Sequence, residues 1–312
     1  MTKPKYTVIA PIYNEIENIP HLYARVCEVM DQTGEAWELV LVDDGSKDGS
    51  TDALRELGKK DNRVRPVIFA RNFGHQIAVS AGMDYARGDA IAIIDADLQD
   101  PPEVILELIE KWKEGYDVVY AVRSEREGES WFKLTTAALF YKFIQKITDV
   151  DIPLNTGDFR LLDRKVLNVM NSMPERNRFL RGMSSWAGFK QIGVEYKRHA
   201  RFAGETHYPL KNMIKLALNA ITGFSYWPLQ LLSKTGVGLV VLSLLLLVLF
   251  IILALVGKVD LTFVLATWLT VIFLAGVLLI SMGILGEYMG RIYDEAKGRP
   301  LYIVAEAPDK DE

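Results

Sequence analysis

Residues 90–102 read Ala90-Ile91-Ala92-Ile93-Ile94-Asp95-Ala96-Asp97-Leu98-Gln99-Asp100-Pro101-Pro102. A short apolar run of this kind is typical of a strand buried on both faces, as in a parallel sheet. Asp95 and Asp97 then fall where the strand leaves the core, which is where open α/β sheets bind their ligands. Two carboxylates one residue apart can hold Mg²⁺ together with substrate phosphates. An acidic turn is the alternative interpretation.

Short apolar strands alternate with helical patterns over residues 1 to about 125. Strands are predicted at 7–12, 38–42, 64–69, 90–94 and 117–122, with helices at 18–30, 51–60, 74–87 and 103–114. This alternation predicts an α/β fold with a doubly wound, mainly parallel sheet flanked by helices. Later elements are predicted as a helix at 131–147, a strand at 156–162, a helix that Asp163 caps and an outer strand at 192–199.

The composition excludes some classes of protein. The chain has 312 residues and a formal charge of −4, so nothing points to nucleic acid as a partner. Cys27 is the one cysteine, which excludes an internal disulfide and fits a reducing compartment. It lies in an apolar helical pattern and is interpreted as a core residue. The N-terminus leads into a short strand, so no signal peptide is predicted.

Two long apolar segments lie near the C-terminus. Thr235 to Val256 and Leu261 to Leu285 contain no charged residue, and each is long enough to cross a bilayer, which takes about 20 residues. The short connection between them predicts a hairpin with both ends on one side. The positive-inside rule places those ends in the cytoplasm, because basic residues flank the hairpin at Lys234, Arg291, Lys297 and Arg299.

The chain is therefore expected to have four parts. These are a cytoplasmic α/β domain at 1–205, an amphipathic juxtamembrane region at 206–233, a transmembrane hairpin at 234–290 and a cytoplasmic tail at 291–312. Helical spacing at 209–226 predicts a helix in the membrane interface, or alternatively one packed on the α/β domain. The tail after Leu301 is expected to be loose. Glycines in the apolar segments allow close helix packing and hence a homo-oligomer, at Gly236, Gly238 and Gly276.

Polar segments follow three neighbouring strands of the predicted sheet, at residues 11–15, 43–46 and 95–97. The carboxyl ends of parallel strands share one edge, so these segments are expected to converge on one crevice. Carboxylates and Tyr13 can receive the base and ribose of a nucleotide. No P-loop or G-x-G-x-x-G motif is present to hold a diphosphate through backbone amides. A metal ion on Asp97, alone or with Asp95, can fill that role.

Five motifs carry a resemblance to a known family. They are Pro11-Ile12-Tyr13-Asn14-Glu15, Val42-Asp43-Asp44-Gly45-Ser46, Asp95-Ala96-Asp97-Leu98-Gln99-Asp100-Pro101-Pro102, Gly157-Asp158-Phe159-Arg160 and Arg201-Phe202-Ala203-Gly204-Glu205. Together they resemble the polyisoprenyl-phosphate glycosyltransferases, which are similar to dolichol-phosphate mannose synthase and belong to the inverting glycosyltransferase family 2 with a GT-A fold. The resemblance covers residues 5 to about 230, and the hairpin resembles that of the bacterial membrane-bound subgroup.

The resemblance implies a role for individual residues. The nucleotide-sugar-binding residues would be Pro11, Tyr13, Glu15, Asp43, Asp95, Ala96 and Gln99. The ligands of a Mg²⁺ or Mn²⁺ cofactor would be Asp95, Asp97 and Gln99. The residues that contact the acceptor phosphate would be Arg123, Lys133, Arg160 and Arg201. The catalytic residues would be Asp158, Asp97, Arg123 and Arg201. The histidines show no metal-binding spacing and are interpreted as surface or loop residues, at His75, His199 and His207.

The acceptor limits what Asp158 has to do. A phosphate monoester has a second pKa near 6, so at pH 7 it is largely dianionic and already nucleophilic. Asp158 is therefore either the base of the family or a group that orients the acceptor or Arg160. The harder problem is to bring two anions together, which a metal ion on the diphosphate and arginine on the acceptor can solve.

The expected reaction transfers glucose from UDP-glucose to polyprenyl phosphate, with inversion, at the bacterial cytoplasmic (inner) membrane. GDP-mannose, UDP-N-acetylglucosamine and a modified arabinose remain open as donors. Processive polysaccharide synthesis is disfavoured, because the chain lacks a Q-x-x-R-W motif and has few spans. A non-catalytic membrane scaffold or lipid translocation partner is the alternative from another class.

Overall fold

The computed structural model describes residues 3–124, 153, 156–198, 227–255 and 262–309. The chain forms two compact units, one made of residues 1–217 and 300–312 and the other of residues 218–299. The predicted helix at 131–147, the predicted interfacial helix at 209–226 and the segment 201–208 lie outside the described residues.

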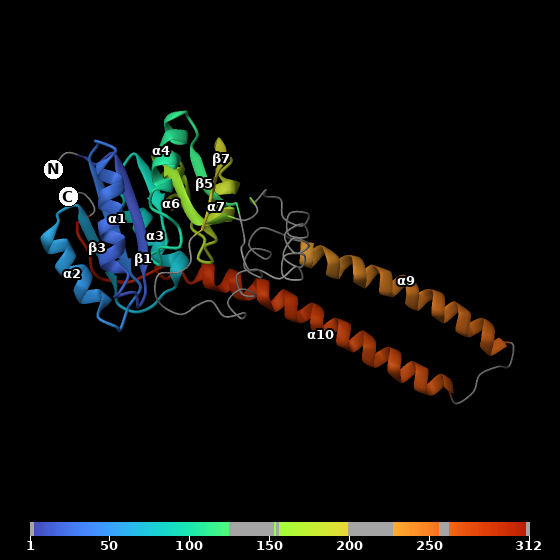
Figure 1. Cartoon of the computed structure of the whole chain (residues 1–312). Coiled ribbons are helices and arrows are strands. Elements are labelled where there is room, and N and C mark those ends of the chain that lie inside the picture. The colour runs from blue at the N-terminus through green and yellow to red at the C-terminus, as the bar shows by residue number, and fades with distance from the viewer. Residues whose placement is uncertain (1–2, 125–152, 154–155, 199–226, 256–261, 310–312) are drawn as a thin grey trace. The chain divides into compact units, whose positions relative to one another are not determined.

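The first unit begins with strands and helices in alternation (Figure 1). The order is β1 (Tyr6–Ile12), α1 (Ile19–Asp31), β2 (Trp37–Asp43), α2 (Ser50–Lys60), β3 (Val64–Phe69), α3 (His75–Tyr85), β4 (Ala90–Ile93), α4 (Val104–Lys113) and β5 (Val118–Arg123). It continues with β6 (Thr156–Asp163), α6 (Arg164–Ser172), α7 (Leu180–Trp186), β7 (Gln191–Tyr196) and, near the C-terminus, β8 (Val304–Glu306). The predicted strands and helices are confirmed within a few residues wherever the chain is described. The short helix α7 and strand β8 were not predicted.

The strands form one eight-stranded sheet in the order β7-β5-β6-β4-β1-β2-β3-β8. The pairs β4–β1, β1–β2, β2–β3 and β5–β7 are parallel. Strand β6 enters between β4 and β5 and runs antiparallel to both. The N-terminal end of β6 therefore lies at the same edge of the sheet as the C-terminal ends of β4 and β5, and this edge carries the candidate site.

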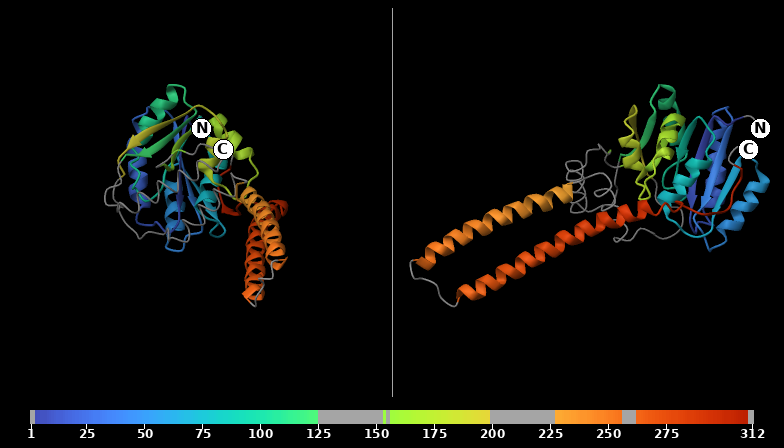
Figure 2. Two further views of the ribbon diagram at one scale, coloured as in Figure 1. Left: turned by 90° about the vertical axis from the view of Figure 1, so that its right-hand side faces the viewer. Right: turned by 180° about the vertical axis from the view of Figure 1, so that it is seen from behind.

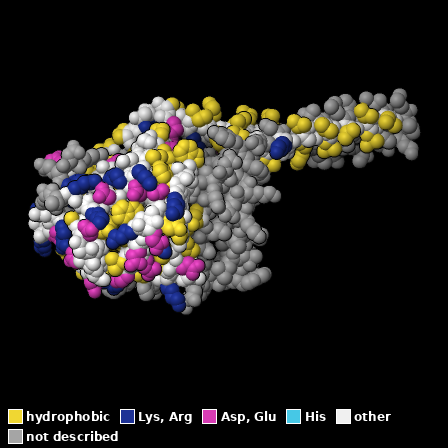
Figure 3. All heavy atoms as spheres, turned by 90° about the horizontal axis from the view of Figure 1, so that it is seen from above, with side chains coloured by type: hydrophobic (Ala, Val, Ile, Leu, Met, Phe, Trp, Pro, Cys, Tyr) yellow, Lys and Arg dark blue, Asp and Glu magenta, His cyan; other side chains and the backbone are white. Residues whose placement is uncertain are grey.

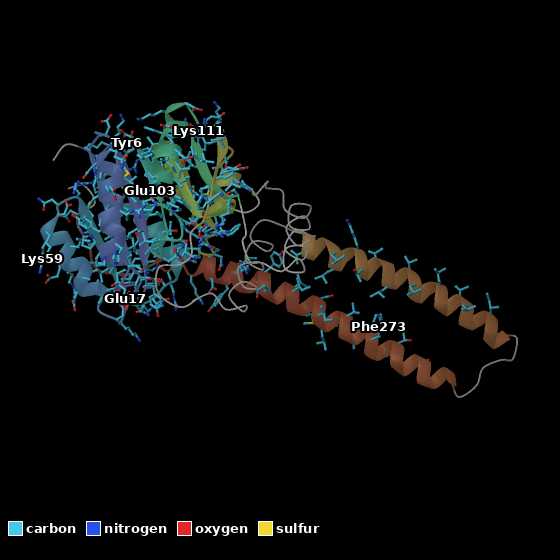
Figure 4. The ribbon with its side chains drawn as sticks, in the orientation of Figure 1. Tyr6, Glu17, Lys59, Glu103, Lys111 and Phe273 are labelled. Carbon is cyan, nitrogen blue, oxygen red and sulfur yellow. The ribbon has the colours of Figure 1, made fainter. Side chains whose placement is uncertain are left out.

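Helices cover both faces of the sheet (Figure 2). Helices α1, α2 and α4 pack together on one face, while α3, α6 and α7 pack together on the other. The strands β1, β2 and β4 consist almost entirely of buried residues, as expected for strands covered on both sides. On the surface, Glu103 (labelled in Figure 4) pairs with Arg25 and links α4 to α1. Asp163 caps α6 as predicted, because its side chain accepts a hydrogen bond from the Lys165 amide at 2.9 Å.

Residues 302–309, the described part of the tail after Leu301, are ordered, so the prediction of a loose tail was wrong for them. Strand β8 pairs antiparallel with β3, with Glu306 opposite Ile68 and Val304 opposite Phe69. Both partners of this pairing belong to the first unit. Backbone hydrogen bonds to an open sheet edge account for the order, because β3 would otherwise leave its peptide groups unpaired.

The second unit contains two helices, α9 (Trp227–Leu255) and α10 (Thr262–Ala296), which lie side by side (Figures 1 and 2). Figure 3 shows hydrophobic side chains along the described surface of these helices, whereas the described face of the first unit mixes basic and acidic ones. Among the described residues, one helical segment, Phe273–Ala296, is long and apolar enough to cross a membrane by length and composition. The crossing of a bilayer by two spans stays a prediction.

Gly82 packs closely between α3 and the sheet. A Cβ atom at this position would lie 2.3 Å from Cγ2 of Ile9 in β1. We expect Gly82→Ala to lower the free energy of unfolding of the first unit by about 1–3 kcal/mol, because the added methyl group overpacks the core. Thermal or chemical unfolding of the purified chain measures the change. Gly290→Ala is the matched control, because its Cβ would meet nothing within 4 Å. Equal stability of the two variants would contradict the expectation.

Candidate active site

The carboxylates of the candidate site come from β4 and β6. Asp95 and Asp97 directly follow β4, and Asp158 lies near the start of β6. Ile93 at the end of β4 lies opposite Arg160 of β6, so the antiparallel register brings the start of β6 to the end of β4. The topology therefore places Asp158 close to Asp95, although the two residues are far apart in the sequence.

Asp158 is buried and its carboxylate is surrounded by donors. Gln76 donates from Nε2 to Oδ2 at 2.7 Å, and Arg181 donates from Nε to Oδ1 at 2.8 Å. The Nε2 atom of His75 lies 3.4 Å from Oδ2. Burial alone would raise the pKa of Asp158, but the charge of Arg181 and the contact with His75 hold this pKa well below its usual range. Asp158 is therefore a firmly ionised group with both oxygens engaged.

His75 lies between two carboxylates. Its side chain is 38% exposed, so it is a surface residue as predicted, but the prediction missed these contacts. Its Nε2 is 3.5 Å from Oδ1 of Asp95 as well as 3.4 Å from Asp158. Burial opposes the charged imidazolium, but the hydrogen bond with Asp158 and the two negative charges raise the pKa of His75 to about 9. Burial raises the pKa of Asp95 to about 6 against the opposing effect of His75, and neighbouring carboxylates add to the rise.

The segment after β4 is held in an unusual backbone conformation. Leu98 has φ 56°, a left-handed value that a leucine rarely adopts and that costs about 1–3 kcal/mol. The Gln99 amide donates to Oδ1 of Asp97 at 3.1 Å and fixes that carboxylate. Strain of this kind is concentrated at ligand-binding sites, and here it lies between two of the predicted metal ligands.

The carboxylates have the properties of a cation site in two respects. Oδ1 of Asp95 is buried and accepts no hydrogen bond, although the imidazole of His75 lies 3.5 Å from it. Asp97 and Asp158 add negative charge beside it. Among the described residues, no three His, Cys, Asp or Glu side chains are arranged to hold a metal ion. A divalent cation that contacts Asp95 and Asp97 would take its remaining ligands from Gln99, water and substrate phosphates, which is the usual situation for Mg²⁺. The residues present therefore fit a substrate-assisted metal site.

The predicted nucleoside-binding residues lie at the ends of β1 and β2. Pro11 is buried in β1, and Tyr13 exposes 39% of its surface. Glu15 accepts a hydrogen bond from the side chain of Asn18 at 2.5 Å. Asp43 is fully buried and accepts from the Ser46 amide at 2.9 Å. Tyr13 is thus available as a stacking surface, whereas Asp43 also shapes the turn that follows β2.

Arginines lie on the β5 side of the same edge. Arg123 ends β5, and a Cβ atom at Gly157 would lie 2.9 Å from its Nη2. Glycine at 157 therefore lets the Arg123 guanidinium approach the backbone next to Asp158. Arg123 also donates to the Tyr196 hydroxyl at 3.4 Å, and that hydroxyl donates to Asp100. The site thus has an acidic side around Asp95 and a basic side around Arg123.

The other predicted phosphate ligands differ in how the structure places them. Arg160 is buried, and it donates to the Ser184 hydroxyl and, at 3.0 Å, to the Gly157 carbonyl. Burial lowers the pKa of Arg160 to about 10. Two of its nitrogen atoms are thus engaged within the domain, and this placement does not favour contact with a substrate phosphate. Lys133 and Arg201 lie outside the described residues, as do His199 and His207.

Sequence reasoning missed His75, Gln76 and Arg181. The sequence carried a signal for His75 and Gln76, because they follow the predicted strand β3 at the same edge of the sheet as the other polar segments. The glycine before them is a further signal, and in the structure Gly74 has φ 103°. No comparable signal existed for Arg181. It lies in α7, a helix of seven residues without a clear apolar period.

Comparison with known proteins assigns the chain to a family. Residues 7–170 match the family described as Glycosyl transferase family 2. The chain belongs to this family. It is 56% identical over 302 residues to an uncharacterised glycosyltransferase of Bacillus subtilis (strain 168), with 96% of this chain and 93% of that protein covered. It is 42% identical over 306 residues to the bactoprenol glucosyl transferase of Shigella phage SfV, with 98% and 100% covered.

A solved structure supports the fold. The chain is similar to glucosyl-3-phosphoglycerate synthase from Mycobacterium tuberculosis in complex with Mn²⁺, UDP and phosphoglyceric acid. The TM-score is 0.50 at 18% sequence identity, over 70% of this chain and 76% of that one. The family inferred from the motifs and the α/β fold of the GT-A class are confirmed.

The charge state of His75 can be measured directly. We expect the pKa of His75 in the metal-free chain to lie well above 6.5, near 9, and to fall in Asp158→Asn, because that variant loses one of the two negative neighbours. NMR of ¹³C-labelled histidine suits a chain with four histidines, and His75→Gln assigns the signal. A wild-type pKa at or below 6.5 would contradict this geometry.

Proposed function

We propose that the chain transfers glucose from UDP-glucose to polyprenyl phosphate, with inversion at the anomeric carbon. The observation that carries the proposal is the pairing of an acidic side, Asp95 and Asp97, with a basic side, Arg123 and Arg181, around Asp158 at one edge of the sheet. Such a site can receive two phosphorylated substrates together. Relatives that are named bactoprenol glucosyl transferase and match this chain over nearly its whole length support the choice of sugar and acceptor.

The donor would bind on the acidic side. Tyr13, Glu15 and Asp43 would receive the nucleoside, while Asp95, Asp97 and Gln99 would hold Mg²⁺ or Mn²⁺. The cation, when bound, would neutralise charge on the leaving diphosphate. The strained turn at Leu98 keeps the two carboxylates and Gln99 in one arrangement, so little reorganisation is needed when the donor binds. The structural relative was solved with Mn²⁺ and UDP, which supports a divalent cation and a uridine nucleotide as ligands.

The acceptor phosphate would bind on the basic side, against Arg123, with Lys133 and Arg201 as further candidates. The second pKa of a phosphate monoester is about 6, so the acceptor is nucleophilic without a strong base. Asp158 is held ionised by Arg181 and His75, and its low pKa makes it a poor proton acceptor. We infer that Asp158 orients Arg181 and Gln76 around the acceptor and does not remove a proton.

A polyprenyl acceptor would place the reaction at a bilayer surface. The helices α9 and α10 would form the membrane hairpin, with the catalytic domain and both termini in the cytoplasm. The basic residues Lys234, Arg291, Lys297 and Arg299 at the hairpin ends support this orientation. Glycines at 236, 238 and 276 leave open space for a neighbouring helix, which supports a homo-oligomer.

Transfer can be tested in membranes that contain the full chain. We expect label from UDP-glucose to enter the lipid fraction in the presence of polyprenyl phosphate and Mg²⁺ or Mn²⁺. Asp97→Asn should reduce the rate at least about 100-fold, because several kcal/mol of charge stabilisation is lost. Asp52→Asn, an exposed carboxylate on α2, is the matched control and should keep the wild-type rate. GDP-mannose and UDP-N-acetylglucosamine test the other donors, and no transfer with any donor would favour a scaffold.

The stereochemistry gives a separate test. Attack by the lipid phosphate from the face opposite the diphosphate predicts a β-linked glucosyl product from an α-linked donor. The anomeric proton coupling in the NMR spectrum of the purified lipid product distinguishes the two linkages. Retention of the α-linkage, or a sugar trapped covalently on the protein, would overturn the single-displacement mechanism.

A further inference from the structure

The C-terminal tail contacts the segment that leads into the active site. β8 extends the sheet beside β3, and the Ala70 amide donates to the Ile303 carbonyl at 3.0 Å. Ala70 directly follows β3 and begins a turn, residues 70–74, that ends at His75, the first residue of α3. The tail therefore reaches the first residue of the turn that presents His75.

Tyr302 is the main anchor of the tail at this point. Its ring stacks on that of Phe69, with centroids 5.1 Å apart and an angle of 18° between the planes. Its hydroxyl donates to Oδ2 of Asp84 in α3 at 2.7 Å. Phe69 also packs edge-on against Phe73 of the turn, at 5.5 Å. One tyrosine thus contacts the strand before the turn and the helix after it.

The turn is fixed on its other side by the segment after β2. Asp44 accepts hydrogen bonds from the amides of Phe73, at 2.6 Å, and Gly74, at 2.9 Å. A Cβ atom at Gly45 would lie 2.6 Å from the backbone of Arg71, so the two segments are in close contact. The turn is therefore held between Asp44 and Gly45 on one side and Tyr302 with Ile303 on the other.

We infer that β8 and Tyr302 are a positioning element of the active site, which holds the turn 70–74 so that His75 and Gln76 meet Asp158. Loss of the tail would leave the edge of β3 unpaired and one face of the Phe69 ring uncovered. The turn would then depend on its contacts with Asp44 and Gly45. Tyr13 and Glu15 follow β1, which is not adjacent to β8 in the sheet, so the nucleoside contacts of these two residues should depend less on the tail than the contacts of His75 do.

The link to the second unit is direct. α10 ends at Ala296 and β8 begins at Val304, so only residues 297–303 separate the apolar helix from the strand. The strand β8, which we infer to position His75, is thus joined to α10 by a short segment of chain. The contacts of the tail with the turn do not depend on which reaction the chain catalyses. The inferred effect of the tail on turnover rests on the proposed function.

Hydrogen exchange of the full chain in detergent tests the geometric part. We expect Tyr302→Ala to speed exchange of the Phe73 and Gly74 amides at least about tenfold, while β1 stays protected. Tyr302→Phe keeps the ring stacking and should change exchange less. Tyr116→Ala removes another half-buried tyrosine, next to β5 at the opposite side of the sheet, and should leave the turn unchanged. Unchanged exchange in the turn, or a general increase over the whole unit, would overturn the inference.

Kinetics test the catalytic part. For Tyr302→Ala we expect kcat to fall about 10- to 100-fold, because His75 and Gln76 would no longer hold Asp158 in its orientation. KM for the nucleotide sugar should change less than kcat, because the nucleoside contacts lie away from the tail. Tyr302→Phe should recover most of the turnover, and Tyr116→Ala should keep it. Faster exchange in the turn with unchanged kcat would overturn a positioning role. If the wild-type chain transfers no sugar, the proposed function fails, and the exchange experiment still decides whether the tail positions the turn.

Discussion

A single imidazole lies between two carboxylates that would otherwise repel each other. Asp95 follows β4 and Asp158 lies near the start of β6, and the antiparallel register of these two strands brings both carboxylates to one edge of the sheet. His75 contacts both, and Arg181 and Gln76 complete the ring of donors around Asp158. The elements that supply these donors, α3 and α7, both pack on the same face of the sheet. The positive charges of His75 and Arg181 therefore offset the negative charges of Asp95 and Asp158, and these contacts join the β4 side of the site to the β6 side.

The balance also explains why the site has two electrostatic halves. Around Asp95 negative charge is in excess, and a buried carboxylate oxygen has no hydrogen-bond partner. Around Arg123 positive charge accumulates on the side of β5 and α7. Two substrates that both carry phosphate can meet only where such halves adjoin, because each needs a counter-charge of its own. Asp158 lies between the halves, is firmly ionised and accepts a hydrogen bond from Arg181.

Sequence reasoning predicted the sheet and its carboxylates because burial on both faces leaves a clear signal, an apolar run that ends in polar residues. It found Asp95, Asp97 and Asp43 by that rule, and Asp158 through the family motif. It missed the contact between His75 and Asp158, because this contact depends on the antiparallel insertion of β6, which no local pattern records. It missed β8, because three residues paired with a distant strand carry no periodicity. The roles of all these residues stay predictions, and Lys133 and Arg201 also lie outside the described residues.

The position of β8 in the chain has a consequence for biosynthesis. The last strand of the sheet is encoded after both apolar helices, so the ribosome must complete α9 and α10 before the edge of β3 can be covered. Until then the newly made domain carries an open edge, which is a site for pairing with other chains. A chain interrupted within the apolar helices would thus lack a complete sheet, and the order of synthesis makes an intact catalytic domain depend on a finished C-terminus.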